Sequence, residues 1–280
     1  MIGVFGVLAW ILFLPAEDLK IPFEPQAGIL KADFYVKPPT EKIRGVLVLS
    51  PGDNGNGGEW IQKKGWRDFA EQESLLLVGV HLVSDPEELQ ANRGYYEAEG
   101  VSGRYLLQAI QKGGGEGKPI YLFGLSGGAH FVSRFVAKYP KLVGGFCAYS
   151  AGWWEEPIQG MPPGVIACGE YDGARYGASL LYFQKGRQLE NRWCWVSLSQ
   201  TDHARHEGLE SFVRHFFKDL LENSSKESNI DSLTQKEQWK DNDTFQSGDS
   251  SNILCSWFPS SSVSLLWQRL HGVKSSRSKN

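Results

Sequence analysis

The chain has 280 residues, of which 41% are hydrophobic and 22% are charged, as in an ordinary globular protein with one sizeable core or two small ones. The net charge of -3 excludes the basic footprint of a nucleic-acid-binding protein and implies no acidic partner. Ten tryptophans fit either a buried core or an aromatic cleft. The function must therefore be sought in motifs along the chain.

The N-terminal segment is uncharged and mostly apolar over residues 2–14. This run is too short to span a bilayer, which needs about 20 residues, but it suits a secretory signal peptide cut after Ala16. We therefore predict a signal peptide at 1–16 and a secreted or periplasmic protein without a stable membrane span. No Lys or Arg precedes the run, and Leu14 suits such a cut poorly. The alternatives are a start codon placed too far downstream or a short hydrophobic anchor, and the alternative location is the cytoplasm.

Apolar runs alternate with helical segments through the rest of the domain, which we place at 17–221. The predicted strands are 28–37, 44–50, 75–82, 120–123, 142–148, 164–168 and 193–198. The predicted helices are 60–72, 97–112, a segment that begins at Ala129, 175–189 and 208–221. The first strand partly alternates between polar and apolar residues, which is typical of an antiparallel edge strand. The others are continuous apolar runs, which predict an α/β fold with a mainly parallel sheet covered on both faces.

The composition changes after Leu221. Residues 222–252 are rich in Ser, Asn, Asp, Lys, Glu and Gln, and we predict a disordered linker there. Residues 253–280 contain a short amphipathic helix and a basic tip. The apolar positions of this helix follow the spacing i, i+3, i+4, i+7, namely Val263, Leu266, Trp267 and Leu270. The helix is expected to dock on the parent domain, or alternatively to bind a partner or a surface.

The stretch 118–129, K-P-I-Y-L-F-G-L-S-G-G-A, predicts a nucleophilic serine. A short buried strand leads into the pattern G-x-S-x-G, and a helix follows it. Such a turn holds Ser126 at strained backbone angles, with its hydroxyl exposed above the sheet. Glycine is needed two residues to either side, because a Cβ there would meet the neighbouring strand and helix. The alternative is a tight turn with an incidental serine.

A serine hydroxyl needs a base to remove its proton and an acid to orient that base. Asp172 directly follows a predicted strand and is the candidate acid, with Glu170 as its rival. His203 lies between the last strand and the last helix and is the candidate base, with His206 as its rival. Both candidates lie after the carboxyl ends of strands, where active sites of parallel sheets gather.

An oxyanion would need two N–H donors. Gly127, which follows the candidate nucleophile, supplies one. By position, Asp53 or Asn54 supplies the other, from the glycine-rich loop 51–58. This loop lacks the Gly-Lys-Ser/Thr ending of a phosphate loop and breaks the pattern of a calcium loop.

The remaining histidines and the cysteines are expected to be structural. His81 ends a strand, with a place in the cleft as the alternative, and His130 is expected to be exposed or to lie behind the reacting groups. Buried free thiols are expected at the four cysteines, although an exported protein could pair them: Cys147, Cys168, Cys194 and Cys255. No C-x-x-C or H-E-x-x-H motif occurs, so we predict no metal and no cofactor.

Together, the motifs L-S-P-G-D-N-G, G-L-S-G-G-A, G-E-Y-D and the late D-H resemble the α/β-hydrolase superfamily over about residues 28–221. They are most similar to its small esterases, including the polyhydroxybutyrate-depolymerase-like and prolyl-oligopeptidase-like branches. The resemblance implies an eight-stranded, mostly parallel sheet and a triad of Ser126, Asp172 and His203. The His-Gly that often precedes the oxyanion loop is Pro51-Gly52 here, so the loop donor stays open.

The substrate is less well defined by the sequence. A large lid domain does not fit into the short segment 152–163, where lids of this superfamily usually enter. Trp153 and Trp154 either form a hydrophobic wall of the cleft or simply pack. The leading hypothesis is a serine hydrolase that cleaves small-molecule or polymer carboxylic esters through an acyl-enzyme. The alternatives are a serine peptidase of the prolyl-oligopeptidase-like type and a catalytically silent hydrolase-fold binding protein. The oligomeric state is left open.

Overall fold

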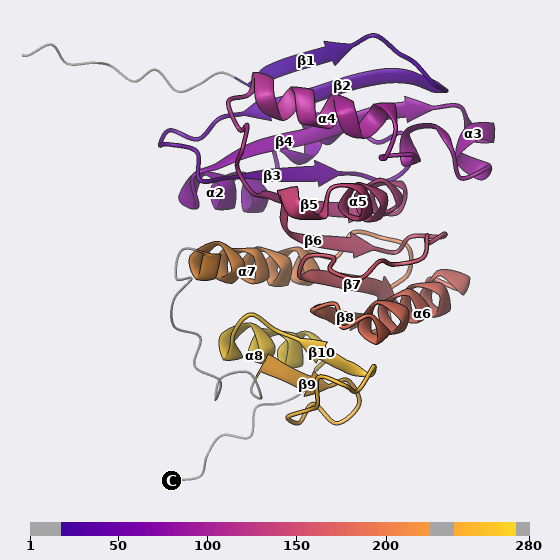
Figure 1. Ribbon diagram of the computed structural model, residues 1–280, viewed down its shortest axis with the longest axis vertical. Coiled ribbons are helices and arrows are strands. Elements are labelled where there is room, and N and C mark those ends of the chain that lie inside the picture. The colour runs from indigo at the N-terminus through magenta and orange to yellow at the C-terminus, as the bar shows by residue number, and fades with distance from the viewer. Residues whose placement is uncertain (1–17, 225–237, 273–280) are drawn as a thin grey trace, which may run out of the picture.

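One large sheet organises the chain (Figure 1). The computed structural model describes residues 18–224 and 238–272. The strand order is β1-β2-β4-β3-β5-β6-β7-β8. The strands are β1 Leu19–Phe23, β2 Ile29–Lys37, β3 Gly45–Ser50, β4 Leu75–Ser84, β5 Ile120–Leu125, β6 Val143–Tyr149, β7 Gly164–Gly169 and β8 Trp193–Leu198. The pairs β1–β2 and β2–β4 are antiparallel and all later neighbours are parallel, so the predicted eight-stranded, mostly parallel sheet is confirmed.

Helices cover both faces of this sheet. They are α1 Gly57–Trp60, α2 Lys64–Gln72, α3 Pro86–Gln90, α4 Val101–Lys112, α5 Gly127–Lys138, α6 Ala174–Gln188, α7 Glu207–Ser224 and α8 Ser261–Leu270. Apolar residues of α4, α5 and α6 form one core with one face of the sheet, whereas those of α2, α7 and α8 form a second core on the other. Successive residues of a strand point alternately into the first and the second core; Val48, for example, lies in the first and Leu49 in the second.

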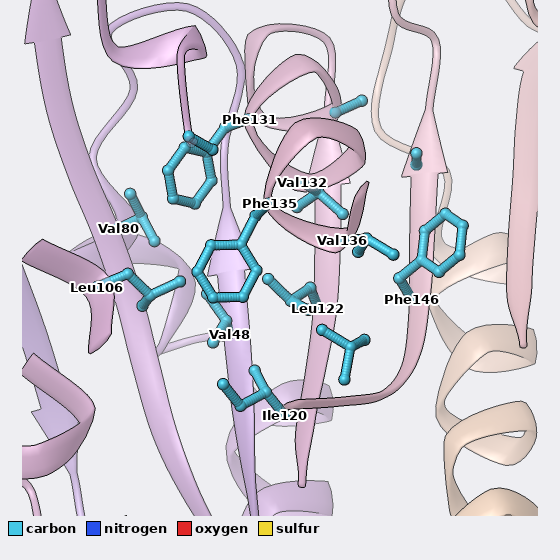
Figure 2. Close-up of a cluster of buried hydrophobic side chains, with 14 of the residues drawn as sticks. Val48, Val80, Leu106, Ile120, Leu122, Phe131, Val132, Phe135, Val136 and Phe146 are labelled. Carbon is cyan, nitrogen blue, oxygen red and sulfur yellow. The ribbon is translucent and has the colours of Figure 1, made fainter. Parts of the chain in front are cut away.

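Helix α5 is fixed over the middle of the sheet (Figure 2). Phe131 and Phe135 on this helix pack among Val48 of β3 and Leu122 of β5. All four side chains are fully buried. Burial of one large apolar side chain stabilises a fold by about 1.5–3 kcal/mol. The start of α5, where Ser126 lies, is therefore held firmly against the ends of β3 and β5.

The structure differs from the predicted elements in several places, and the helix predicted at 97–112 begins only at Val101. The helix expected at 60–72 is divided into α1 and α2, because Asn56 caps an earlier start and Lys63 has an extended backbone. The Asn56 side chain accepts a hydrogen bond from the Gly58 N–H at 2.9 Å. Strand β1 was not predicted at all, because its five residues are mostly exposed and include Pro22.

The linker predicted at 222–252 needs correction. Helix α7 extends to Ser224, residues 225–237 lie outside the described residues, and residues 239–241 form a strand. This strand, β9 Trp239–Asp241, pairs with β10 Cys255–Trp257 in a small antiparallel sheet. The polar residues between them build turns instead of remaining disordered, as when the Asp241 carboxylate accepts hydrogen bonds from the N–H and the hydroxyl of Thr244. Buried apolar residues then anchor the turns to the domain.

The C-terminal unit, which we define as residues 238–272, covers the outer edge of β8. The Trp195 N–H donates to the Ser256 hydroxyl at 2.8 Å, and the Trp195 carbonyl accepts from the Trp267 indole N–H at 2.7 Å. The Ser197 N–H donates to Nε2 of His271 at 3.1 Å. Figure 1 shows the unit, coloured yellow, beside β8. Side chains thus satisfy edge groups that would otherwise be open to strand pairing.

The predicted signal peptide at 1–16 lies outside the described residues. Within 18–224 and 238–272, no helix is both long and apolar enough to cross a bilayer.

We predict that Trp267→Ala lowers the free energy of unfolding by about 3–5 kcal/mol, because it leaves a cavity and removes the bond to Trp195. Urea denaturation followed by circular dichroism measures this loss. Leu265→Ala, on the same helix but 48% exposed, is the matched control and should cost less than about 1 kcal/mol. Equal losses in the two variants would contradict the role assigned to Trp267.

Candidate active site

The turn between β5 and α5 presents the serine hydroxyl. Ser126 has φ 55° and ψ -118°, a strained conformation for a residue with a side chain, and it precedes the first turn of α5. Its N–H donates to the Tyr149 carbonyl at 2.8 Å, and its own carbonyl accepts from the Ala129 N–H at 2.8 Å. These bonds fix the backbone on both sides of the side chain. The hydroxyl is thereby held at the carboxyl edge of the sheet.

Glycine is required on either side of Ser126, as the sequence indicated. A Cβ on Gly124 would lie 2.3 Å from the Gly128 carbonyl oxygen. A Cβ on Gly128 would lie 2.0 Å from the Ser50 carbonyl oxygen. Both partners are backbone atoms, which cannot move aside as a flexible side chain can. The close approach of β3, β5 and α5 therefore depends on these two residues.

The structure brings together the three residues that the sequence selected. Nε2 of His203 lies 2.9 Å from Oγ of Ser126, and Nδ1 lies 2.8 and 3.0 Å from the two oxygens of Asp172. An ionised carboxylate only accepts hydrogen bonds, so Nδ1 carries the proton and donates it to Asp172. In the neutral form of the ring, Nε2 is then unprotonated and accepts from the Ser126 hydroxyl. This is the arrangement in which an imidazole can act as a base towards a serine.

The two rivals have other partners. The Glu170 carboxylate accepts from the Ser197 hydroxyl at 3.1 Å and from the Gln200 N–H at 3.4 Å, so it links the turns after β7 and β8. Nδ1 of His206 accepts from the Leu209 N–H at 3.1 Å, in the first turn of α7. Both side chains support the loop that carries His203.

Further hydrogen bonds hold the loop that carries His203, in addition to the bonds of His203 with Ser126 and Asp172. The Tyr149 hydroxyl donates to the Ala204 carbonyl at 2.6 Å. The Tyr171 N–H donates to the Thr201 carbonyl at 2.9 Å. Arg205 forms two hydrogen bonds of 2.7 Å with the Glu210 carboxylate. His203 is therefore on a well-supported loop, although 37% of its side chain is exposed.

His130 forms a buried wall behind the serine, so it is not exposed. Its Nε2 accepts a hydrogen bond from the Gly152 N–H at 3.2 Å, and its ring stacks on Tyr96 with centroids 4.5 Å apart. Burial, aided by the positive charges of Arg134 and Arg175, lowers the pKa of His130 to about 3. The ring is therefore neutral at neutral pH. His81 lies on β4 and stacks against Tyr35, away from these residues.

The loop after β3 lies against the start of α5. The Gly55 N–H donates to the Gly52 carbonyl at 2.8 Å, and the Asn54 side chain both donates to the Ser84 carbonyl and accepts from the Ser84 N–H. A Cβ on Gly127 would lie 3.1 Å from the Asp53 backbone nitrogen, so these two amides are neighbours. The Asp53 carboxylate accepts from the Tyr96 hydroxyl at 2.5 Å.

The Tyr95 hydroxyl also lies beside this turn, since a Cβ on Gly127 would be 2.6 Å from its oxygen. Burial raises the pKa of Tyr95, so this hydroxyl is protonated at neutral pH.

Two hollows meet at Ser126. The first, of about 370 Å³, is lined on its apolar side by Pro86, Leu89 and Trp153. The second, of about 600 Å³, includes His203 among its lining residues, whereas the first does not. Both are lined by Asp53, Ser126 and Arg175.

The two candidate tryptophans differ in position. Trp153 is 59% exposed and lines the first hollow. Trp154 stacks on Tyr182 with ring centroids 4.2 Å apart and packs against the core. Three further residues that line the first hollow were not predicted from the sequence: Arg175, Tyr96 and Leu89. Arg175 lies in the first helical turn after Asp172, a spacing that could have identified it.

Several solved structures have a similar architecture. The poly(3-hydroxybutyrate) depolymerase LpqC from Bordetella parapertussis matches with a TM-score of 0.53 at 18% identity, over 78% of this chain and 92% of that one. An esterase from Pyrobaculum calidifontis matches with a TM-score of 0.54 at 14% identity, over 74% and 86%. The S-formylglutathione hydrolase of Staphylococcus aureus matches with a TM-score of 0.53 at 11% identity, over 73% and 98%.

The chain has the α/β-hydrolase fold. No family model and no curated protein matches its sequence. In open α/β sheets, ligands bind at the carboxyl ends of the strands, and the two hollows lie at this edge. Within the described ranges, no group of three or more His, Cys, Asp or Glu residues could hold a metal ion. The four cysteines are buried free thiols.

We predict that Gly128→Ala destabilises the fold by more than about 2 kcal/mol, because its Cβ would overlap the Ser50 carbonyl. Urea denaturation measures the change. Gly177→Ala on α6 is the control: nothing lies within 4 Å of its Cβ, so alanine should be neutral or slightly stabilising. Unchanged stability in Gly128→Ala would refute the close backbone contact.

We further predict an acid-sensitive stability that depends on His130. The unfolded chain takes up a proton near the ordinary pKa of 6.5, whereas the folded chain does so only near a pKa of about 3. The unfolded state therefore binds more protons between these values, and stability is lost as the pH falls below 6.5. From about pH 6.5 to 4.5 this single group accounts for roughly 2–3 kcal/mol.

The free energy of unfolding, measured across this pH range for the wild type and for His130→Gln, gives the test. Glutamine can still accept the hydrogen bond of Gly152 but does not titrate, so the variant should lose less stability on acidification. Parallel pH curves for the two proteins would rule out this role of His130.

Proposed function

We propose that this chain is a serine hydrolase that cleaves carboxylic esters through an acyl-enzyme. The observation that carries the proposal is the continuous set of hydrogen bonds from Asp172 through His203 to Ser126. These bonds lie at the carboxyl edge of an α/β-hydrolase sheet. Structures with this fold include proteins described as a poly(3-hydroxybutyrate) depolymerase, an esterase and an S-formylglutathione hydrolase. Their identities of 11–18% support the chemistry only in general terms.

In the proposed first half-reaction, Oγ of Ser126 attacks the ester carbonyl and forms a C–O bond. The serine proton moves to Nε2 of His203, and Asp172 stabilises the imidazolium through its bond to Nδ1. The carbonyl electrons move onto the carbonyl oxygen. When the tetrahedral intermediate collapses, the bond to the alcohol oxygen breaks and that oxygen takes the proton from Nε2.

In the second half-reaction water replaces the alcohol. His203 removes a proton from water, the resulting hydroxide attacks the acyl carbon, and the bond to Oγ of Ser126 breaks. The serine oxygen takes back the proton from Nε2, so the free acid leaves and the enzyme is restored. Ester plus water thus gives acid plus alcohol, and no cofactor is required.

The oxyanion would be bound by the N–H groups of Gly127 and Asp53. Gly127 begins α5, where backbone N–H groups lack helical acceptors and the helix dipole favours negative charge. We assign Asp53 as the second donor because its backbone nitrogen lies close to Gly127. Each such donor is worth about two to three orders of magnitude in rate.

We predict that a fluorophosphonate probe labels the wild-type protein and that Ser126→Ala is not labelled, because the probe reacts only with an activated serine. Ser133→Ala, which removes a hydroxyl from the same helix, is the matched control and should be labelled normally. A correctly folded wild-type protein without labelling would overturn the proposed function.

We also predict that Asp172→Asn lowers kcat for a short-chain ester by about 10⁴-fold, because the imidazole is no longer held in the required tautomer.

A further inference from the structure

We propose that the preferred ester carries a carboxylate at the end of a short acyl chain, and that Arg175 binds this carboxylate. The inference rests on the proposed function and specifies the substrate class of the same site. It starts from the two hollows that meet at Ser126. Only the second hollow is lined by His203, which must protonate the departing alcohol. The alcohol therefore leaves through the second hollow, and the first holds the acyl group.

The first hollow suits a short chain with a charged end. Its volume of about 370 Å³ and its walls of Pro86, Leu89 and Trp153 fit a few methylene groups. Arg175 is the one permanent cation among the described residues that line it. The other basic ring there, His130, is neutral at neutral pH because burial lowers its pKa to about 3. A positive charge beside an apolar wall is the arrangement that recognises a carboxylate on an aliphatic chain.

The guanidinium of Arg175 is only weakly engaged in the structure. Its one charged partner among the described residues is Asp172, with Nη1 3.5 Å from Oδ1, and that carboxylate already accepts from His203. The arginine side chain is 45% exposed, so its remaining donors can reach a ligand. Arginine offers two parallel N–H groups that match a carboxylate.

Asp53 also lines the first hollow, but its carboxylate accepts from Tyr96 and lies close to Gly127. Arg175 lies near Gly152, since a Cβ on that residue would be 3.6 Å from Nε of the arginine. The substrate carboxylate is therefore expected beside Gly152 and Trp153.

The sharing of Asp172 favours the same ligand. Arg175 and His203 both face this single carboxylate, and His203 needs it when the ring takes the serine proton. A carboxylate on the substrate would give Arg175 a partner of its own and leave Asp172 to the imidazolium.

Two ethyl esters of matched shape test the inference. Monoethyl succinate ends in a carboxylate, and ethyl isocaproate carries an isopropyl group in its place. We expect the wild type to prefer the succinate by kcat/KM, measured by titration of the released acid. Arg175→Gln should lower the ratio of the two kcat/KM values by about 10- to 100-fold, mainly through KM of the succinate. Arg175→Lys should restore part of the ratio, because it retains the charge without the paired donors.

Lys185→Gln is the matched control, because it removes an exposed, ion-paired cation from the same helix and should leave the ratio unchanged. An equal loss for both esters in Arg175→Gln would overturn the inference and make Arg175 a positioning residue that acts through Asp172. A wild-type preference for isocaproate, or for an isocaproate ester of glycolic acid that carries the anion on the alcohol, would also overturn it. These outcomes still include ester turnover and fluorophosphonate labelling, whereas the absence of both would refute the proposed function itself.

Discussion

The structure depends on a close backbone contact where β3, β5 and α5 meet. Gly128 lies so near the Ser50 carbonyl, and Gly124 so near Gly128, that neither position can hold a side chain. This contact bends the chain sharply and places Ser126 at positive φ. The strain is sustained because α5 is anchored by fully buried phenylalanines over the middle of the sheet. Packing energy spread over a whole helix thus maintains a local conformation that an isolated turn would not adopt.

The rest of the site is assembled from loops at the same edge of the sheet. The loop after β3 brings Asp53 beside Gly127, the turn after β7 brings Asp172, and the loop after β8 brings His203. Each loop is short or internally bonded, and Glu170 ties the turns after β7 and β8 together. Preorganised groups lose little entropy when a substrate binds, which suits a reaction whose charges must be stabilised as they form.

The sequence predicted the residues whose role depends on local chain geometry. Ser126, Asp172 and His203 each follow a strongly apolar strand, and the structure brings all three within hydrogen-bond distance. The sequence did not predict the burial of His130, because its neighbours Tyr96 and Gly152 come from segments distant in the chain. Arg175 was missed although it lies only three residues after Asp172, because the hollow that it lines is formed by several separate segments. The polar composition also led to the wrong prediction of a disordered linker at 239–252. The polar residues there form turns, and the apolar residues that anchor these turns lie elsewhere in the fold.

The C-terminal unit is best understood as part of the α/β-hydrolase-fold domain. Its side chains satisfy the edge of β8 at Trp195 and Ser197, the strand that leads into the His203 loop. The side chain of Ser197 in turn donates to Glu170, which connects that strand to the turn of Asp172. His271 can accept from the Ser197 N–H only while its Nε2 is unprotonated, and burial lowers its pKa, so the contact is retained at neutral pH. An open edge at β8 would invite strand pairing with other chains and would leave the support of the His203 loop incomplete. The unit therefore stabilises the sheet and the proposed active site through the same three contacts.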